Sequence, residues 1–396
     1  MSRQLRSLAA VAALLPSAWG AVLDLPVHFD NSYAQVEASI GTPAQTYMLH
    51  FDTGSATTWV VGKGCLNCPN GSGYKRVGYS TDDSSTGVNV GIYGYIDYSG
   101  GATSGPGMAD MFGLPAEATG EDGLRWNQTF MAADQSSWRF IPADGFLGLA
   151  FSSIAEAGAT TMVETMMQKG LLDEPRFAVY YGTEFETTGS DPAGVLTIGG
   201  SHEDRYVDGE LTYVPLQQEV EFQVWRTKLS SITGAGTGKA AGQRSQSTTG
   251  QLGDYGRAVF DTGSGYFQVP TNIIDDLYES IGMNWTAIKE GKHLPLCAEF
   301  TSDWSVTLNF GESETGPKLT MTGEQLARPG FAHRDDACFP PFDDSEVVDL
   351  ALIGTPLLHQ FYTVFDFGAN EVANYSPRIG FGNLKEDLKP QFARSG

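Results

Sequence analysis

The sequence predicts a mostly β protein built from two related halves. Its 396 residues are too many for one hydrophobic core and suit two domains of ordinary size. The chain contains 48 glycines and only 18% charged residues, a composition typical of a turn-rich β protein rather than of a helical bundle. An internal repeat of five identical residues then indicates that the two halves are related.

The repeat consists of two copies of Phe-Asp-Thr-Gly-Ser. Residues 51–55 recur as residues 260–264, and a short apolar or aromatic stretch follows each copy. A second marker follows at nearly equal distance, at residues 146–149 and 352–354. Two apolar residues before a glycine indicate a buried strand that meets a close backbone approach. A duplicated β domain with two similar turns and no chemistry is the structural alternative.

Most segments between these markers have the apolar or alternating pattern of strands, and few look helical. Helices are expected at residues 160–169 and 273–281, the second preceded by capping residues at 270–272. The clearest strands are expected at residues 194–198, 211–215 and 361–365.

The halves are expected to divide in a polar stretch near residues 184–193, which gives an N-terminal lobe at 21–188 and a C-terminal lobe at 189–396. A second polar stretch, residues 234–253, is dense in Gly, Ser, Thr and Gln and predicts a long surface loop. A loose phosphate-loop pattern within it lacks the Ser or Thr required after Lys239, so we do not expect a phosphate site there.

The charge of the chain excludes two classes of partner. It has 47 acidic and 24 basic residues and a formal net charge of −23 at pH 7. Such a protein repels nucleic acid and anionic membranes, and we expect neither as a partner. Solubility accounts for this charge, but so does adaptation to acid, where carboxylates become neutral. The charge alone leaves both explanations open.

The N-terminus has the pattern of a secretory signal. Two arginines precede an apolar run at residues 8–15, and the small residues Ala18 and Gly20 fit a cut after Gly20. The run is too short to cross a membrane. Residues 1–20 are therefore expected to be a signal peptide and the protein to be secreted, and the polar C-terminus offers no membrane anchor.

An exported protein with an even number of cysteines is expected to form disulfides. Of the possible pairings we favour the two that each lie within one half, Cys65 with Cys68 and Cys297 with Cys338. A zinc site is the weaker alternative, because only one pair has CxxC spacing, and no metal is expected. Sequons that would make the protein a glycoprotein begin at Asn70, Asn127, Asn284 and Asn374.

The repeated turn is where chemistry is expected. Two carboxylates held close together, here Asp52 and Asp261, cannot both ionise cheaply, so the pair holds one proton over an acidic window. Such a pair can take a proton from water and give another to a peptide carbonyl. In each turn we expect the glycine N–H to donate to the carboxylate, the threonine to bond to the opposite turn and the serine to orient the carboxylate. These supporting residues are Thr53, Gly54, Ser55, Thr262, Gly263 and Ser264.

These motifs, together with others along nearly the whole chain, resemble the pepsin family of aspartic peptidases. Residues 40–45 resemble the strand-turn before the first catalytic loop, and residues 144–150 resemble the strand beneath that loop. Trp59 stands where the family has its first-lobe tryptophan. Tyr98 and the nearby Gly101 resemble the flap hairpin with its substrate-covering tyrosine.

The resemblance implies a bilobal fold of two related β-barrel-like lobes with a central cleft. It implies an aspartic endopeptidase that acts at acid pH on an extended peptide or protein substrate bound beneath Tyr98. It implies no metal or organic cofactor, and we expect a monomer.

Three features depart from the family pattern. Ser99 follows the flap tyrosine where glycine is usual, and His50 stands where the family has an aliphatic residue. A neutral, packed His50 is expected, with a titrating one as the alternative. A basic pro-segment is not recognised between Gly20 and residues 40–42. A catalytically silent, peptide- or protein-binding member of the same fold therefore stays as the alternative function.

Overall fold

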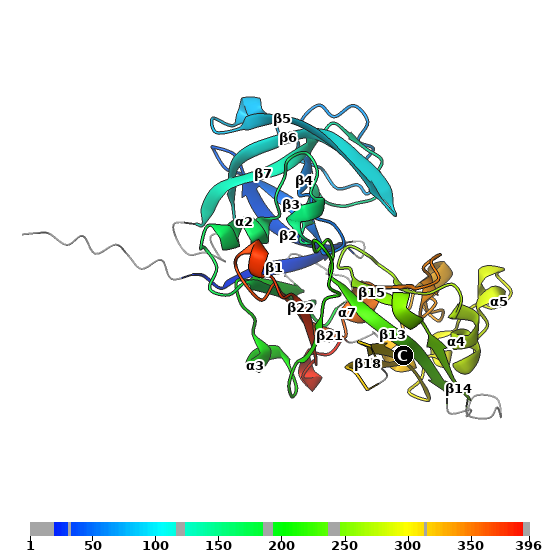
Figure 1. The fold of residues 1–396 in the computed structure, drawn as a ribbon. Helices are drawn as coiled ribbons and strands as arrows, with labels where there is room; N and C mark the ends of the chain where they lie inside the picture. Colours follow the sequence, from blue (N-terminus) through cyan, green and yellow to red (C-terminus); the bar gives the residue numbers. More distant parts are fainter. Residues whose placement is uncertain are drawn as a thin grey trace, which may run out of the picture.

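A computed structural model describes residues 20–30, 33–115, 123–184, 193–236, 246–312 and 315–390. Except for Gly20, the expected signal peptide lies outside the described residues, and so does most of the expected boundary at 184–193. Within the described ranges the strands form two sheets. The ribbon shows two lobes, one with strands β3 to β7 and the other with β13, β14 and helices α4 and α5 (Figure 1).

The larger sheet has fourteen strands among the described residues. Their spatial order is β12 (Thr212–Pro215), β22 (Arg378–Asn383), β21 (Phe361–Asp366), β10 (Arg176–Tyr180), β11 (Gly194–Ile198), β1 (Leu23–Asp30), β2 (Tyr33–Ile40), β3 (Gln45–Asp52), β9 (Gly145–Gly148), β4 (Trp59–Val61), β7 (Arg125–Ala133), β6 (Gly101–Gly113) and β5 (Val88–Tyr98), with β8 (Gln135–Ser136) beside β6. All three strands expected from the sequence are confirmed, as β11, β12 and β21.

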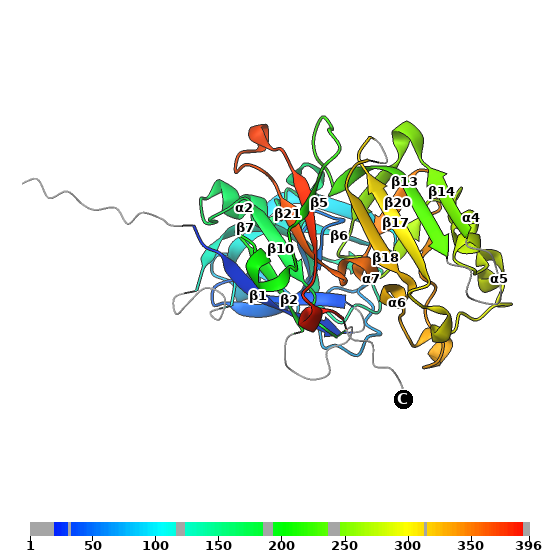
Figure 2. The same ribbon diagram turned by 90° about the horizontal axis from the view of Figure 1, so that it is seen from below.

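Both halves of the chain contribute to this sheet, which joins the two lobes. β10 of the first half pairs antiparallel with β21 of the second half and places Phe177 opposite Phe365. The two rings stack with their centroids 4.8 Å apart. Figure 2 shows β10 and β21 side by side. The first strand illustrates why these residues form strands, because its burial alternates with the period of two that a half-buried strand requires.

The smaller sheet has eight strands, all from the second half. In spatial order they are β18 (Lys318–Thr322), β17 (Trp304–Phe310), β13 (Arg226–Gly236), β15 (Arg257–Phe260), β20 (Leu350–Ile353), β16 (Phe267–Val269) and β19 (Asp343–Asp344), with β14 (Gln246–Gln251) beside β13. One expectation was wrong here. The polar stretch at residues 234–253 is not all loop, because β14 pairs antiparallel with the end of β13. Residues 237–245 between them lie outside the described ranges.

The helices in the described ranges are short. They are α2 (Met162–Gln168), α3 (Glu203–Tyr206), α4 (Ile274–Ser280), α5 (Trp285–Lys289), α6 (Gly323–Leu326) and α7 (Thr355–Leu358). Both expected helices are confirmed, as α2 and α4. Thr161 caps α2 by accepting a hydrogen bond from the N–H of Glu164. The expected capping of α4 by residues 270–272 was wrong, because its N-cap is Ile273, which offers no side-chain acceptor.

The sequence repeat is also a structural repeat. In the first half, β9 pairs in parallel with β3 and places Gly148 opposite Asp52. In the second half, β20 pairs in parallel with β15 in the same manner. A side chain at Gly148 would collide with the backbone of Ala56, and one at Gly354 would collide with the backbone of Ser264. Glycine is needed at both positions because each backbone passes directly beneath an Asp-Thr-Gly turn.

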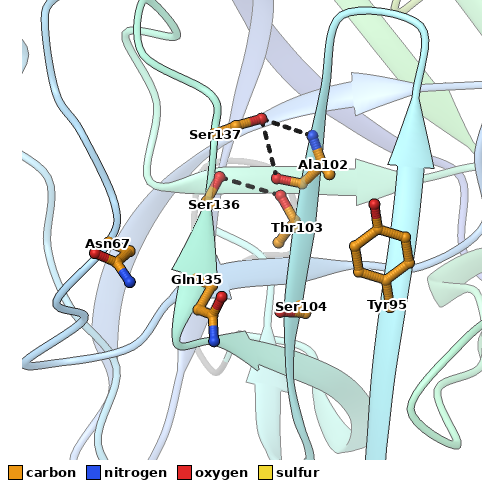
Figure 3. A pocket seen from close by; sticks show the side chains of 8 residues that line it. All are labelled: Asn67, Tyr95, Ala102, Thr103, Ser104, Gln135, Ser136 and Ser137. Atoms are coloured by element: carbon orange, nitrogen blue, oxygen red, sulfur yellow. Dashed lines mark hydrogen bonds between the residues drawn. The ribbon is translucent and has the colours of Figure 1, made fainter.

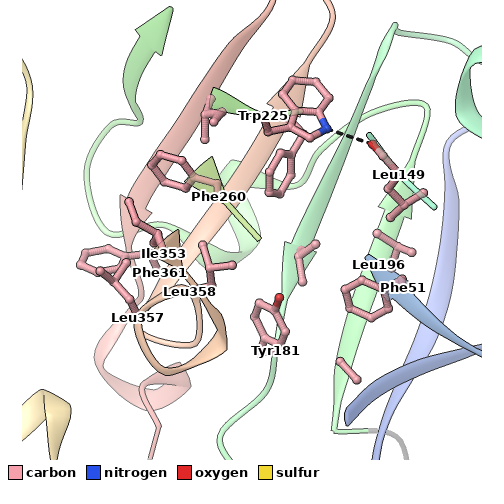
Figure 4. Packing of buried hydrophobic residues seen from close by; sticks show 14 of the residues in the cluster. Phe51, Leu149, Tyr181, Leu196, Trp225, Phe260, Ile353, Leu357, Leu358 and Phe361 are labelled. Atoms are coloured by element: carbon pink, nitrogen blue, oxygen red, sulfur yellow. Dashed lines mark hydrogen bonds between the residues drawn. The ribbon is translucent and has the colours of Figure 1, made fainter. Parts of the chain in front are cut away.

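Buried aromatic and aliphatic side chains from both halves fill the space beneath the two turns (Figure 4). Phe51 and Phe260, which precede the two aspartates, are both fully buried. Trp225 of the second half donates its indole N–H to the Leu149 carbonyl of the first half at 2.9 Å. The turns therefore rest on a core that both halves share, which limits their relative movement.

Candidate active site

The two Asp-Thr-Gly turns face each other at the junction of the halves. Asp52 is the last residue of β3, and Asp261 directly follows β15. A Cβ added at Gly54 would lie 2.7 Å from Oδ1 of Asp261. One added at Gly263 would collide with the carboxyl group of Asp52. Each glycine therefore leaves room for the carboxyl group of the opposite turn.

Four hydrogen bonds between the threonines and the opposite turns hold the pair in register. The Thr53 N–H donates to Oγ1 of Thr262 at 3.0 Å, and the Thr262 N–H donates to Oγ1 of Thr53 at 2.9 Å. The Thr53 hydroxyl donates to the Phe260 carbonyl at 2.8 Å, and the Thr262 hydroxyl donates to the Phe51 carbonyl at 3.1 Å. Both threonines are fully buried. This nearly symmetric network links the halves as the sequence predicts.

The glycine and serine donors orient the carboxyl group of Asp52. The Gly54 N–H donates to its Oδ1 at 2.8 Å, and the Ser55 hydroxyl donates to its Oδ2 at 2.5 Å. In the second turn the Gly263 N–H donates to Oδ1 of Asp261 at 2.9 Å. Both oxygens of Asp52 are therefore held by groups that favour a carboxylate acceptor.

The expected role of Ser264 was wrong. Its hydroxyl donates to the carbonyl of Tyr266 at 3.4 Å rather than to the carboxyl group of Asp261. The second turn is more open at this point, because Gly265 follows and a Cβ added there would touch nothing within 4 Å. In the first turn the same position is a buried alanine, Ala56. The two turns are thus related in sequence but differ in their donors: a serine hydroxyl bonds to Asp52, whereas the backbone of Gly263 and Ser264 bonds to Asp261.

The two carboxyl groups interact directly, and the interaction changes the acidity of Asp261. Burial, the charge of Asp52 and a hydrogen bond with Asp52 together raise the pKa of Asp261 well above its usual value. Asp52 is itself 4% exposed. This arrangement can hold a proton on Asp261 at a pH where an ordinary aspartate is ionised.

The hairpin of β5 and β6 brings the expected flap residues to the same place. Tyr98, at the end of β5, pairs with Gly101 at the start of β6. The indole N–H of Trp59 donates to the Tyr98 hydroxyl at 3.0 Å. The Tyr98 ring also packs against Phe146, with centroids 5.3 Å apart. Burial and the charge of nearby Asp52 raise the pKa of Tyr98, which indicates that the phenol lies close to the carboxyl pair.

Two side chains near the carboxyl pair were missed in the sequence. Trp138 packs against Tyr98 with ring centroids 5.6 Å apart, and a Cβ at Gly101 would crowd its indole. Tyr181 is buried beneath the turns, and burial and the charges of both aspartates raise its pKa. Neither lies in a repeated motif, so no sequence signal pointed to them.

His50 is a buried histidine next to the site. Its Nδ1 lies 2.8 Å from the Ala34 carbonyl oxygen. Its ring packs edge-on against Tyr33 and Phe146, with centroids 5.0 Å apart in each pair. Burial lowers its pKa, although the charge of Asp52 acts in the opposite direction. These contacts fit the expected neutral, packed histidine.

Both expected disulfides are confirmed. Cys65 pairs with Cys68, and their Cα atoms are 5.8 Å apart. Cys297 pairs with Cys338, and their Cα atoms are 4.8 Å apart. Each bridge lies within one half of the chain, as the sequence predicts.

All four sequon asparagines, Asn70, Asn127, Asn284 and Asn374, have exposed side chains. Exposure is a requirement for a glycan, but it does not test whether one is attached. Asn284 also serves as the N-cap of α5 through its Oδ1, which leaves its amide nitrogen available.

A separate hollow of about 240 Å³ lies on the β5–β6 hairpin (Figure 3). Uncharged side chains line it: Asn67, Tyr95, Ala102, Thr103, Ser104, Gln135, Ser136 and Ser137. It includes neither aspartate nor Tyr98, so it is not the site of the carboxyl pair.

No group of three or more His, Cys, Asp or Glu side chains in the described ranges is arranged to hold a metal ion. None of the helices in the same ranges has the length and apolar character that a membrane span requires.

A two-lobed β fold with facing Asp-Thr-Gly turns is the arrangement that defines pepsin-like aspartic peptidases. The family model described as eukaryotic aspartyl protease matches residues 32–374. Pepsin-3 of Oryctolagus cuniculus is 28% identical over 345 residues, which cover 84% of this chain and 78% of that protein. Pepsin A of Sus scrofa is 27% identical over a region that covers 90% of this chain and 85% of that protein. A probable vacuolar protease A of Arthroderma benhamiae is 29% identical, covering 87% and 78%.

The chain therefore belongs to the eukaryotic aspartyl protease family. This membership confirms three predictions from the sequence: the resemblance itself, the mostly β two-lobed fold, and the assignment to the aspartic-type endopeptidases, which are hydrolases.

Proposed function

We propose that the protein hydrolyses peptide bonds at acid pH with Asp52 and Asp261 as its catalytic pair. The observation that carries this proposal is the contact between the two carboxyl groups. Burial, together with the charge and hydrogen bond of Asp52, raises the pKa of Asp261 well above its usual value. Paired aspartates that share one proton are the established chemistry of aspartic proteases in general.

The hydrogen bonds favour one division of roles within the pair. The Gly54 N–H and the Ser55 hydroxyl donate to Asp52, whereas Asp261 accepts backbone N–H groups but no serine hydroxyl. We therefore assign the ionised role to Asp52 and the protonated role to Asp261, whose pKa is raised. A different division would exchange the two roles and leave the reaction unchanged.

The reaction then follows from these protonation states. Asp52 takes a proton from water as the water oxygen bonds to the scissile carbonyl carbon, and Asp261 gives its proton to the carbonyl oxygen. The tetrahedral diol collapses when Asp52 passes its proton to the leaving nitrogen and Asp261 takes one from a diol hydroxyl. The C–N bond breaks, and the pair returns to its starting state with no covalent intermediate.

The substrate in this proposal is an extended peptide or protein segment bound beneath the β5–β6 hairpin. Tyr98 supports this because its phenol lies near Asp52 and is held by Trp59. Closure of such a hairpin would exclude water and order the peptide over the carboxyl pair.

Cleavage of a denatured protein between about pH 3 and 5 tests the proposal. We expect hydrolysis that pepstatin, an inhibitor of aspartic proteases, abolishes. Asp52→Asn and Asp261→Asn should each fold normally and lose activity. A folded wild-type protein that binds peptide without turnover would instead support the silent binding protein.

We also propose that the protein is a secreted, N-glycosylated monomer whose signal peptide ends at Gly20. The exposed sequon asparagines and the two disulfides support an oxidising, exported environment. The relatives named vacuolar protease A make the vacuole the other destination to test. The N-terminal sequence, glycosidase sensitivity and fractionation of the expressed protein would decide between them.

A further inference from the structure

Arg328 lies next to the turn that carries Asp261. It follows α6, and its Nη1 donates to the carbonyl of Gly265 at 3.1 Å. Within the described ranges, no other arginine or lysine hydrogen-bonds to residues 51–55 or 260–266. A fixed positive charge therefore lies on the second-lobe side of the carboxyl pair.

The guanidinium group of Arg328 is held in place, but most of its N–H donors form no hydrogen bond to the described residues. It stacks over the ring of Phe339, with its Cζ 5.2 Å from the ring centroid, which fixes its plane. A guanidinium has five N–H donors. In the part of the chain that the structure describes, one hydrogen bond from it is formed, to Gly265. The residue is half-buried, so donors remain for a group that enters from the solvent.

The charges around Arg328 favour an anionic partner under acid conditions. Two groups face it, Asp343 on β19 and Tyr266 in the turn after Asp261. Burial raises the pKa of Asp343, so this carboxyl group becomes neutral at a higher pH than an ordinary aspartate does. Burial lowers the pKa of Arg328, but a guanidinium stays charged at any acid pH. The positive charge is therefore least compensated in the range where the proposed enzyme works.

Tyr266, which faces Arg328, also lies close to the first lobe. Tyr266 lies near Tyr33 of β2, whose ring packs against His50. Tyr266 is 57% exposed. A peptide that crosses the carboxyl pair would thus pass close to Tyr266 and Arg328.

We propose that Arg328 is a specificity-determining residue that binds a substrate carboxylate on the second-lobe side of the scissile bond. This inference depends on the proposed function and adds a substrate preference to it. The planar guanidinium suits a carboxylate because it offers two parallel N–H donors. The carboxylate belongs either to an internal Glu or Asp side chain or to the C-terminus of a short peptide.

The test uses matched peptides that differ only in Glu against Gln at each position around the scissile bond, with amidated C-termini. At about pH 5 a Glu side chain is mostly ionised. Wild type should show a kcat/KM about five- to tenfold higher for Glu at one position, chiefly through KM. In Arg328→Gln the Glu-to-Gln ratio should fall to about one, and any effect of losing the bond to Gly265 should change cleavage of both peptides equally. Gln peptides with a free C-terminus show whether that carboxylate binds instead.

Arg334→Gln is the matched control, because Arg334 is exposed and its guanidinium bonds to Asp336 rather than to either turn. The Arg334→Gln variant also removes one positive charge, but it should keep the wild-type Glu-to-Gln ratio of kcat/KM. Arg328→Lys keeps the charge but loses the paired donors, so it should retain part of the preference. If Arg328→Gln fails to fold, Arg328→Lys carries the test.

The proposal is overturned if wild type shows no preference for either carboxylate. It is also overturned if the Arg328 variants keep the full preference, or if Arg334→Gln loses it equally. A wild-type protein that cleaves neither Glu nor Gln peptides would contradict the proposed function instead, so the two failures are distinguishable.

Discussion

Replacement of Thr53 by valine tests the link between the two turns. Valine has nearly the same shape as threonine but has no hydroxyl group. The change removes the bond to the Phe260 carbonyl at 2.8 Å and the bond from the Thr262 N–H at 2.9 Å. Thr53 is fully buried, so water cannot replace the lost partner.

The expected loss of stability comes from two backbone groups that lose their partner, the Phe260 carbonyl and the Thr262 N–H. A buried donor or acceptor that loses its hydrogen bond costs about 1–3 kcal/mol. Two such groups give an expected loss of about 3 kcal/mol in the free energy of unfolding, after some relaxation. Thr53→Ser keeps the hydroxyl and should lose about 1 kcal/mol, for the missing methyl group.

Denaturant unfolding at a pH near neutrality measures both variants, and cleavage of a peptide substrate measures the effect on catalysis. In Thr53→Val the carboxyl pair is less well positioned, so kcat/KM should fall about tenfold or more. Thr53→Ser should retain most of the activity. If the valine and serine variants had the same stability and activity, the cross-turn hydroxyl bonds would not hold the site together.

Three further predictions concern the flap, the disulfides and the dependence of stability on pH. Tyr98→Ala should lower kcat/KM about a hundredfold but the free energy of unfolding by only about 1–2 kcal/mol, because the half-buried ring acts chiefly on substrate. Kinetics and urea unfolding measure the two effects. Equal losses of activity and stability, in free-energy terms, would show that Tyr98 is not a flap residue. Replacing Cys297 and Cys338 by alanine should lower the free energy of unfolding by about 4 kcal/mol, and removing the Cys65–Cys68 bridge should lower it by about 2 kcal/mol. The difference arises because the closed loops span 41 and 3 positions. Urea midpoints in the reverse order would contradict this loop-entropy reasoning. Burial lowers the pKa of His359 from 6.5 to about 3. Between these two pH values the unfolded state therefore binds one more proton than the folded state. The free energy of unfolding should fall by about 1.4 kcal/mol for each pH unit below 6.5 because of this group. His359→Asn should remove one proton from that slope, and an unchanged slope in urea titrations would refute the assignment.

The sequence alone was sufficient for the features that repeat. The two Asp-Thr-Gly copies predicted that Asp52 and Asp261 would come together. The matched apolar segments before glycine predicted buried strands with a close backbone approach, and the structure shows such strands as β9 and β20. These features follow from the repeat, because both copies carry the same turn and the same following glycine segment. The disulfide pairing was predictable because each bridge closes within one half.

Features that no repeated motif marks could not be predicted. The hydroxyl of Ser264 bonds to the Tyr266 carbonyl and not to Asp261, although the two repeat copies are identical. β14 forms from a polar segment because β13 offers it a free edge, which overrides composition. Arg328 reaches the site from 63 residues beyond Gly265, and no motif marks it.

The account depends most on the proton that Asp52 and Asp261 are proposed to share. A carbon-13 NMR titration of protein labelled at the aspartate carboxyl groups, with Asp261→Asn used for assignment, measures this directly. The account predicts that Asp261 stays protonated well above the usual aspartate pKa and that Asp52→Asn lowers its pKa, because the charge and hydrogen bond of Asp52 are lost. An Asp261 that titrates like an exposed aspartate, and is unaffected by Asp52→Asn, would contradict it.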